Sequence, residues 1–361
     1  MFRPIPAAIA AATFVSASGV ATTQARAHHP GGIGNSGDGG PILTMSASTL
    51  EAGHMVAGIT IDHVHLDTLS DARLTSAAAA GVEGVHGLSS IRAYALTGAY
   101  GITNDLMVAF RLPFVKRTGI RAAEEMAPGS GIFEVENHGG SSGIGDLTML
   151  AQYRFLNNRG TGTQAAVLAG FKAPTGATGR VSRQGEPLDV EFQPGSGAWG
   201  GLVGAAFTQR LAPKLSFDAS VLYALATTGT MNTDLGDQVL FNAAITYRLA
   251  SLGSAASGPM WHGAKPHAHG ADAHGHAPQE SAGLKVDLVL ELNGEWHAGQ
   301  STLGVSDPNS GGTTIYVSPG IRLGYDKVSA FATIGIPVLN ETNGIQPEVD
   351  WRLTTGVAVA F

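Results

Sequence analysis

The chain has 361 residues, of which 43% are hydrophobic and only 14% are charged, with fifty glycines and no cysteine. Its formal net charge of −7 provides no basic footprint, so nucleic acid is excluded as a partner. Without disulfides, a chain of this size has to be held by its core or by its solvent, and so little charge argues against a surface fully exposed to water.

Residues 1–27 have the three-part pattern of a secretory signal peptide. A short basic start at residues 1–3 is followed by an apolar run at residues 5–21 and by an A-x-A cleavage site at residues 25–27. We therefore expect the mature protein to start at His28. Beyond this point no stretch approaches the roughly eighteen consecutive apolar residues of a membrane-spanning helix.

Beyond the signal peptide, the dominant pattern is a period of two. In residues 238–249 the odd positions, from Val239 to Leu249, are apolar, while Gln238, Asn242 and Arg248 lie on the even side. The same alternation recurs in residues 214–223 and 284–296. Such runs exceed the five or six residues that are usual for a globular strand. They are typical of a transmembrane β-barrel, in which lipid-facing and lumen-facing side chains alternate.

The alternation predicts about twelve strands. In chain order we expect them at residues 53–66, 88–101, 105–116, 143–156, 163–173, 197–210, 214–227, 236–250, 283–297, 312–324, 327–338 and 347–361. Tight connections, as at residues 103–104, 212–213 and 326–327, alternate with long ones at residues 67–87, 117–142 and 174–196. Because such barrels have short periplasmic turns and longer outer loops, this asymmetry orients the barrel.

The prediction is therefore an all-β fold: a transmembrane, antiparallel, up-and-down β-barrel in the lipid of the outer membrane of a Gram-negative bacterium. Its expected parts are the signal peptide at 1–27, a periplasmic N-terminal lead at 28–52, and the barrel at 53–361 with a histidine-rich periplasmic insertion at 251–281. Residues 42–50 also fit an additional strand. The last strand ends on the aromatic Phe361, which resembles the signal read by the outer-membrane assembly machinery.

Four phrases of the sequence resemble a known family. They are GIGDLTMLAQYRFL (143–156), LVLELNGEW (288–296), TTIYVSPGIRLGY (313–325) and QPEVDWRLTTGVAVAF (346–361). They look like the outer-membrane transporters of the MetA-pathway-of-phenol-degradation family. The resemblance implies a channel that passes small solutes, aromatic or hydrophobic, with no catalytic residue to carry over and no required cofactor.

The insertion at 251–281 departs from the usual pattern of that family. It carries five histidines spaced by Gly, Ala and Pro, namely His262, His267, His269, His274 and His276. Counting strands from a periplasmic N-terminus places the insertion on the periplasmic side. Imidazoles without thiolates favour zinc, nickel or copper(II) as the bound metal. The alternative interpretation is a solvating linker whose histidines are incidental.

Alternation also predicts which charged side chains line the lumen. They are Arg92, Arg154, Asp218, Arg248, Lys285, Asp287, Glu291, Glu295, Arg322 and Arg352. Both signs occur, so neither anion nor cation selection follows. The alternative is that these groups neutralise one another as a rigid network in a narrow, partly plugged barrel.

Other functions stay open beside the channel. They are an outer-membrane protein associated with heavy-metal handling, an outer-membrane lipid hydrolase, a structural barrel, and a soluble β-sandwich that packs its apolar faces together. A hydrolase needs a serine, a histidine and an orienting polar group in one place. The nearest candidate is the serine-rich stretch at 140–142 beside His138, for which a loop is the expected role. We therefore expect no enzymatic activity.

Overall fold

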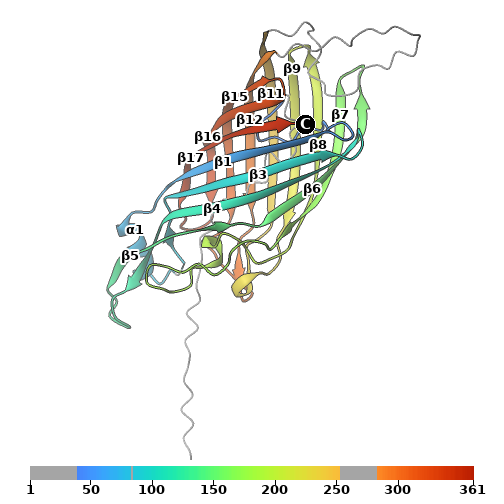
Figure 1. Ribbon diagram of the computed structural model, residues 1–361. Helices are drawn as coiled ribbons and strands as arrows, with labels where there is room; N and C mark the ends of the chain where they lie inside the picture. The colour runs from blue at the N-terminus through green and yellow to red at the C-terminus, as the bar shows by residue number, and fades with distance from the viewer. Residues whose placement is uncertain (1–38, 83, 253–282) are drawn as a thin grey trace, which may run out of the picture.

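The structure is a computed structural model that describes residues 39–82, 84–252 and 283–361. In this part of the chain, twelve long antiparallel strands form a closed barrel (Figure 1). They are β1 (Met55–Asp67), β3 (Ser90–Gly101), β4 (Leu106–Glu125), β6 (Leu147–Asn158), β7 (Thr163–Ala173), β8 (Gly200–Ala212), β9 (Leu215–Leu225), β11 (Gln238–Leu252), β12 (Leu284–His297), β15 (Gly312–Tyr325), β16 (Val328–Thr342) and β17 (Glu348–Ala360).

Strands that follow one another along the chain are also neighbours in the barrel. β1 pairs with β3 on one side and with β17 on the other, so Ile59 lies opposite both Leu96 and Val357. The pairing of β4 with β6 completes the ring. Closure leaves the barrel without an edge strand. This matters in hydrocarbon, because no water is present there to bond unpaired backbone N–H and C=O groups. The predicted antiparallel, up-and-down barrel of about twelve strands is confirmed.

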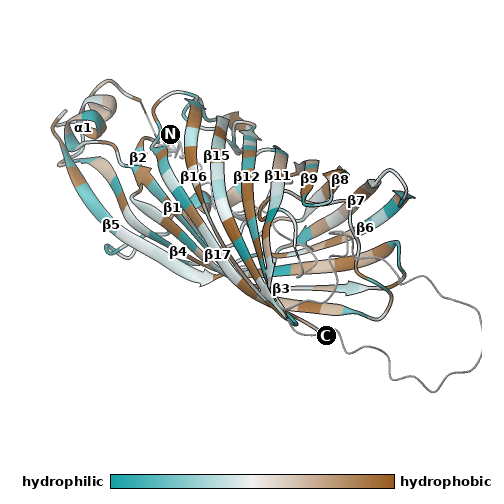
Figure 2. Ribbon diagram, turned by 90° about the horizontal axis from the view of Figure 1, so that it is seen from above, coloured by the Kyte–Doolittle hydropathy of each residue, from teal (hydrophilic) through white to brown (hydrophobic). Residues whose placement is uncertain are grey.

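The two faces of the barrel wall differ in polarity, and Figure 2 shows hydrophobic and hydrophilic residues alternating along the strands. On β12 the exposed side chains include Leu288, Leu290 and Leu292, whereas Asp287 and Glu291 are buried on the inner face. An apolar exterior and a hydrogen-bonding interior are what a lipid-embedded barrel needs.

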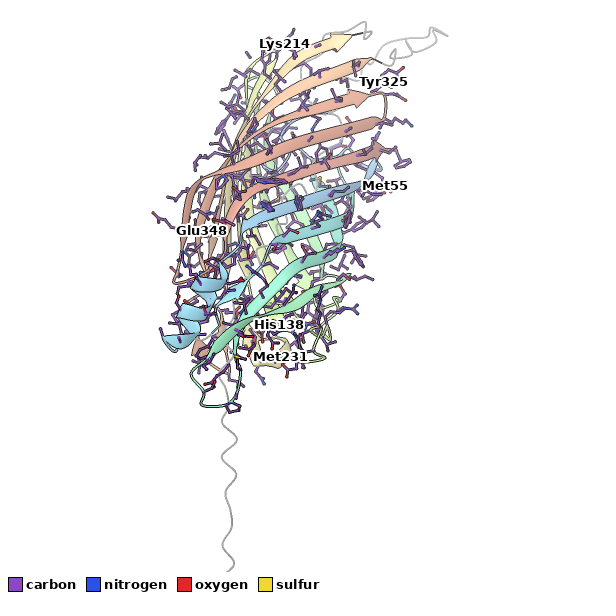
Figure 3. All side chains as sticks on the ribbon, turned by 90° about the vertical axis from the view of Figure 1, so that its left-hand side faces the viewer. Met55, His138, Lys214, Met231, Tyr325 and Glu348 are labelled. Atoms are coloured by element: carbon purple, nitrogen blue, oxygen red, sulfur yellow. The ribbon has the colours of Figure 1, made fainter. Side chains whose placement is uncertain are left out.

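The two ends of the barrel carry connections of different lengths. Met55, Lys214 and Tyr325 mark the end with the short turns, and His138, Met231 and Glu348 mark the end with the long loops (Figure 3). Exposed aromatic side chains lie near both ends, at Tyr100, Tyr153, Tyr247 and Tyr325 and at Phe171, Trp199, Tyr223 and Trp296. Such belts flank the apolar band of outer-membrane barrels, whose short turns face the periplasm.

β4 continues well beyond the strand expected at 105–116. Its first part pairs with β6, and its second part, from Phe114 to Glu125, pairs with β5 (Phe133–Ile144). About ten tilted residues suffice to cross a bilayer, so the second part of this 20-residue strand projects outward. The sequence predicts a loop at residues 117–142 because this stretch is rich in glycine, serine and charge, and the structure shows strands there instead.

The remaining elements belong to the long loops. α1 (Asp71–Ala79) begins after Ser70, whose hydroxyl accepts the N–H of Arg73. The others are β2 (His86–Gly87), η1 (Val190–Phe192), η2 (Thr230–Asn232), β10 (Thr233–Asp234), β13 (Ser301–Thr302) and β14 (Val305–Ser306). Within the described ranges, no helix has the length and apolar character needed to cross a membrane.

Candidate functional site: the barrel lumen and its outer mouth

Residues 39–50, which we name the luminal segment, run along the inside of the barrel. Thr44 and Ala47 are completely buried, and Ile42 is 1% exposed. The sequence predicts a periplasmic lead at residues 28–52, and the structure instead places residues 39–50 inside the barrel. The physical reason is that small and apolar side chains fit the interior, while the polar backbone of the segment finds partners on the strands.

Glu291 is the main partner of the luminal segment. Its carboxylate accepts the backbone N–H groups of Ile42, Leu43 and Thr44 at 2.8 to 3.2 Å. Glu291 is 1% exposed, so these charge-assisted bonds compensate for the removal of the carboxylate from water. One side chain of the wall therefore holds three consecutive residues of the segment.

Other wall residues hold the segment nearer the short-turn end. The Thr208 hydroxyl accepts the N–H of Ala47 at 2.9 Å and donates to Asp218 at 2.6 Å. The Gln152 amide donates to two carbonyl oxygens of the segment at 2.9 and 3.0 Å. The segment leaves the lumen beside Asn104, whose side chain accepts the N–H of Ala52 at 3.0 Å. Its backbone is thus bonded to the wall along its length.

Four of the charged residues predicted for the lumen form two ion pairs inside it. Arg248 on β11 binds Asp287 on β12 through two guanidinium nitrogens, the longer contact being 3.1 Å. Arg352 on β17 binds Glu295 on β12, and its guanidinium lies 3.8 Å from the ring centroid of Tyr316. All four are buried or nearly so. These groups neutralise one another, as the network interpretation required.

Three further predicted residues also lie on the inner face. Arg154 binds Asp105 at 2.7 and 2.9 Å near the short-turn end. Arg322 donates to the carbonyl oxygen of Pro41 at 2.7 Å and so holds the start of the luminal segment. Lys285 is half-buried on the inner face of β12. Together with Asp218, Glu291 and the two ion pairs described above, these three residues are the predicted charged groups that the structure places in the lumen.

Arg92 is the exception, because it lies on the outer face. It is exposed, and its Nε donates to His63 at 3.2 Å. Its neighbours Ile91 and Ala93 are the buried ones, and they pack with Val115 inside the outer half of the barrel. At this level the apolar Ile91 and Ala93 take the inward positions, so the rule that polar residues face the lumen assigned Arg92 to the wrong side.

The loop at 174–199 closes the outer mouth of the lumen. Leu188 and Phe192 from this loop join Ile91 and Val115 of the wall in one buried apolar cluster. Phe192 is 1% exposed. Burial of an aromatic ring of this size is a large part of what keeps the loop folded inward.

Asp146, in the break between β5 and β6, ties the same loop to the wall. Its carboxylate accepts the N–H of Gly176 at 3.0 Å, and both the N–H and the hydroxyl of Ser196 at 2.9 and 2.7 Å. Gly176 and Gly195 approach so closely that a Cβ on either one would lie 2.5 Å from the Cα of the other. Only glycine permits this crossing.

A pocket of about 500 Å³ opens beside the loop, between β4, β5 and residues 181–183. Its lining includes Lys116, His138, Ser141 and Arg183. Volumes of this order are typical of small-molecule sites. The pocket lies at the end of the barrel with the long loops.

The serine-rich stretch considered for a hydrolase lies in this pocket. Residues 139–143 have the spacing G-x-S-x-G, but they belong to an antiparallel strand and not to the strand-to-helix turn that such a motif requires. The Ser141 hydroxyl donates to the carbonyl of Phe192, and His138 faces Glu124 at 3.5 Å. Both side chains therefore have structural partners other than one another.

The histidines predicted to bind metal, at 262, 267, 269, 274 and 276, lie outside the described residues. The structure does describe both flanks of the insertion. β11 and β12 meet through the pair Ser251 and Lys285, at the end with the short turns. The fold brings together a different group at the outer mouth, His86, Asp189 and Glu191, which the sequence does not predict. No spacing signals that group, because His86 lies about a hundred residues from the two carboxylates.

Three solved outer-membrane proteins are similar to this chain to different degrees. A COG4313 outer membrane channel from Pseudomonas putida F1 is 15% identical with a TM-score of 0.51, over 87% of this chain and 98% of that chain. The toluene transporter TbuX of Ralstonia pickettii is 9% identical with a TM-score of 0.36, over 91% and 96%. The monoaromatic hydrocarbon channel CymD is 8% identical with a TM-score of 0.39, over 86% and 89%. The first of these likenesses shows a common fold.

The search among curated protein sequences gave no match. The family described as "Putative MetA-pathway of phenol degradation" matches residues 94–277, which is more than half of the chain. The chain is therefore an outer-membrane β-barrel protein that belongs to this family.

Proposed function

We propose that the barrel is a channel for small aromatic or hydrophobic solutes across the outer membrane. The observation that carries the proposal is the luminal segment. The lumen accommodates a polypeptide segment together with its side chains. Such a segment is about 10 Å across, which is the face-to-face distance between packed sheets. A lumen of that width also admits a molecule with a single aromatic ring once the segment moves aside.

The way in which the segment is held supports a channel over a purely structural barrel. A structural barrel of this size can fill its interior with side chains of the wall. Here the interior holds, besides side chains of the wall, residues 39–50 and the loop at 174–199, both attached through hydrogen bonds and apolar contacts. Because these parts are not strands of the wall, they can be displaced without opening the barrel. The family description, which refers to phenol, supports the solute class.

Planar-bilayer recording of the purified protein tests the proposal. A variant that lacks residues 39–50 is expected to conduct ions, and phenol in the bath is expected to reduce its current, whereas glucose at the same concentration is not. A deletion variant that inserts into the bilayer but never conducts would contradict the channel.

We also propose that the histidine-rich insertion binds zinc, nickel or copper(II) in the periplasm. Five imidazoles in a segment without thiolates support this, as does the position of its flanks at the short-turn end. A peptide of residues 259–280 titrated with each metal tests it. A dissociation constant of about a millimolar or weaker would mean that the segment is only a linker, because metal sites bind more tightly than this at neutral pH.

A further inference from the structure

Three side chains with metal-binding groups meet at the outer mouth of the barrel. His86 comes from β2, and Asp189 and Glu191 come from the loop at 174–199. One ligand atom from each lies within 4.8 Å of the other two. His86 Nε2 lies 3.8 Å from Asp189 Oδ2. Two atoms bound to one zinc ion lie about 3–4 Å apart, because each bond is about 2.0–2.2 Å long.

Glu191 is the buried member of the group. It is 3% exposed, and neither carboxylate oxygen has a hydrogen bond within the described structure. A buried carboxylate without compensation is strongly unfavourable. A cation placed among these groups would stabilise both carboxylates.

His86 is oriented as a metal ligand. Its Nδ1 lies 3.1 Å from the carbonyl oxygen of Gly84, which fixes the proton on Nδ1 and leaves the lone pair of Nε2 facing Asp189. Its ring packs edge-on against Phe192 with centroids 5.3 Å apart. With its proton on Nδ1, the imidazole presents Nε2 in the neutral form that binds metal.

Arg117 offers a competing explanation, because its charge acts on Glu191 from β4. Its Nη1 donates to the carbonyl of Gln193 at 2.9 Å, and its Nε has no hydrogen-bond partner in the described residues. The guanidinium is thus directed at the backbone of the loop and leaves both oxygens of Glu191 without a bond. The side chains of His86 and Asp189 are 14% and 20% exposed, so an ion can reach the group from outside.

We propose that His86, Asp189 and Glu191 bind one divalent transition-metal ion of the zinc class, which fastens the loop at 174–199 to β2. An imidazole with two carboxylates suits zinc better than magnesium or calcium, which prefer oxygen ligands throughout. The bound ion would hold Phe192 and Leu188 in the apolar cluster that closes the lumen. This site is distinct from the histidine-rich insertion, whose flanking strands β11 and β12 meet at the opposite end of the barrel.

Calorimetric titration of zinc into the refolded, chelator-treated, full-length protein tests the proposal. The histidines of residues 262–276 are first replaced by glutamine so that only the mouth can bind tightly. One zinc per chain is expected. Glu191→Gln or His86→Gln is expected to weaken zinc binding by at least about 100-fold, which is the most that loss of a residue hydrogen-bonded to a ligand usually costs. His54→Gln, at an exposed residue beside the short turns, serves as the matched control and is expected to bind normally.

Two results would overturn the proposal. One is zinc affinity that stays the same in Glu191→Gln and His86→Gln, and the other is the absence of stoichiometric binding in the parent. If a substituted protein fails to fold, as judged by the loss of heat-modifiable migration on a gel, X-ray absorption of the zinc-loaded parent decides. One imidazole nitrogen with oxygen neighbours is expected, and a zinc shell without imidazole would refute the site.

Discussion

Glu291 on β12 and Leu43 in the luminal segment, 248 residues apart in sequence, are joined by hydrogen bonds of 3.0 Å from the Leu43 N–H to both carboxylate oxygens. The same carboxylate accepts the N–H groups of Ile42 and Thr44. Hydrogen bonds to a charged group contribute about 1.5–3 kcal/mol each. Glu291 is therefore the wall residue on which the position of the segment most depends, and altering it should change how the lumen is filled.

The first prediction concerns the substitution Glu291→Ala. It removes the acceptor for three buried N–H groups, so the luminal segment is expected to leave its place and the single-channel conductance to rise at least several-fold. Glu291→Gln keeps one acceptor oxygen in place and is expected to conduct less than the alanine variant. Glu134→Ala, at an exposed position on β5, serves as the control. A conductance of Glu291→Ala equal to that of the control would show that the segment does not block the pore.

The second prediction concerns the buried pair of Arg248 and Asp287. Arg248→Met leaves the Asp287 carboxylate buried without its partner, and removing one member of a buried pair costs about 3–5 kcal/mol. The double variant Arg248→Met with Asp287→Leu removes both charges and is expected to recover most of that loss. Urea unfolding in lipid vesicles measures the free energy of unfolding of each variant. A double variant as unstable as the single one would mean that the pair adds more than mutual neutralisation.

The barrel could be predicted from the sequence because its signal is local. Alternation places Leu288, Leu290 and Leu292 on one face of β12 and Asp287 and Glu291 on the other, and no knowledge of the partner strands is needed for that. The same rule failed at Arg92, because its apolar neighbours Ile91 and Ala93 are the residues that face the interior. It also failed for β5, in which residues 137–142 carry no apolar side chain and so show no period of two.

The contents of the lumen could not be predicted, because they depend on contacts between distant parts of the chain. The residues around Ile42 read equally well as a strand or as a lead, and only their bonds to Glu291 determine where they lie. His86 and Glu191 are likewise more than a hundred residues apart in the numbering and meet only after the loop at 174–199 folds into the mouth. Local composition carries no trace of either meeting.

The third prediction tests which face of β12 contacts lipid. Leu290 is 52% exposed near the middle of the strand, and an arginine on the lipid face at the bilayer midplane destabilises a barrel by about 2–4 kcal/mol. Leu290→Arg is therefore expected to lower the free energy of unfolding in vesicles by that amount. Val181→Arg, at a similarly exposed residue of the loop at 174–199, is expected to change it by less than about 0.5 kcal/mol, as surface substitutions do. Equal losses in both variants would refute the assignment of the lipid face.

The fourth prediction concerns pH and the ion pair of His138 on β5 and Glu124 on β4, which lies outside the membrane. The Glu124 carboxylate, 3.5 Å away, raises the pKa of His138 above its ordinary value of 6.5. In turn, His138 lowers the pKa of Glu124 below its ordinary value of 4.5. The contribution of His138 is complete below pH 6.5 and is lost as the pH rises through its raised pKa. That of Glu124 is complete above pH 4.5 and is lost as the pH falls through its lowered pKa.

The projecting hairpin of β4 and β5 should therefore be most stable between about pH 4.5 and 6.5, the interval between the two ordinary pKa values in which both contributions are complete. Hydrogen exchange of residues 120–139, corrected for the intrinsic effect of pH, measures this. His138→Gln removes the ionisable partner and is expected to flatten the profile, and His54→Gln is expected to leave it unchanged. Because Glu124 is half exposed, water screens the pair and the effect is small. Protection that is the same at pH 5.5 and pH 8.5 in the unsubstituted protein would show that the pair contributes nothing to the hairpin.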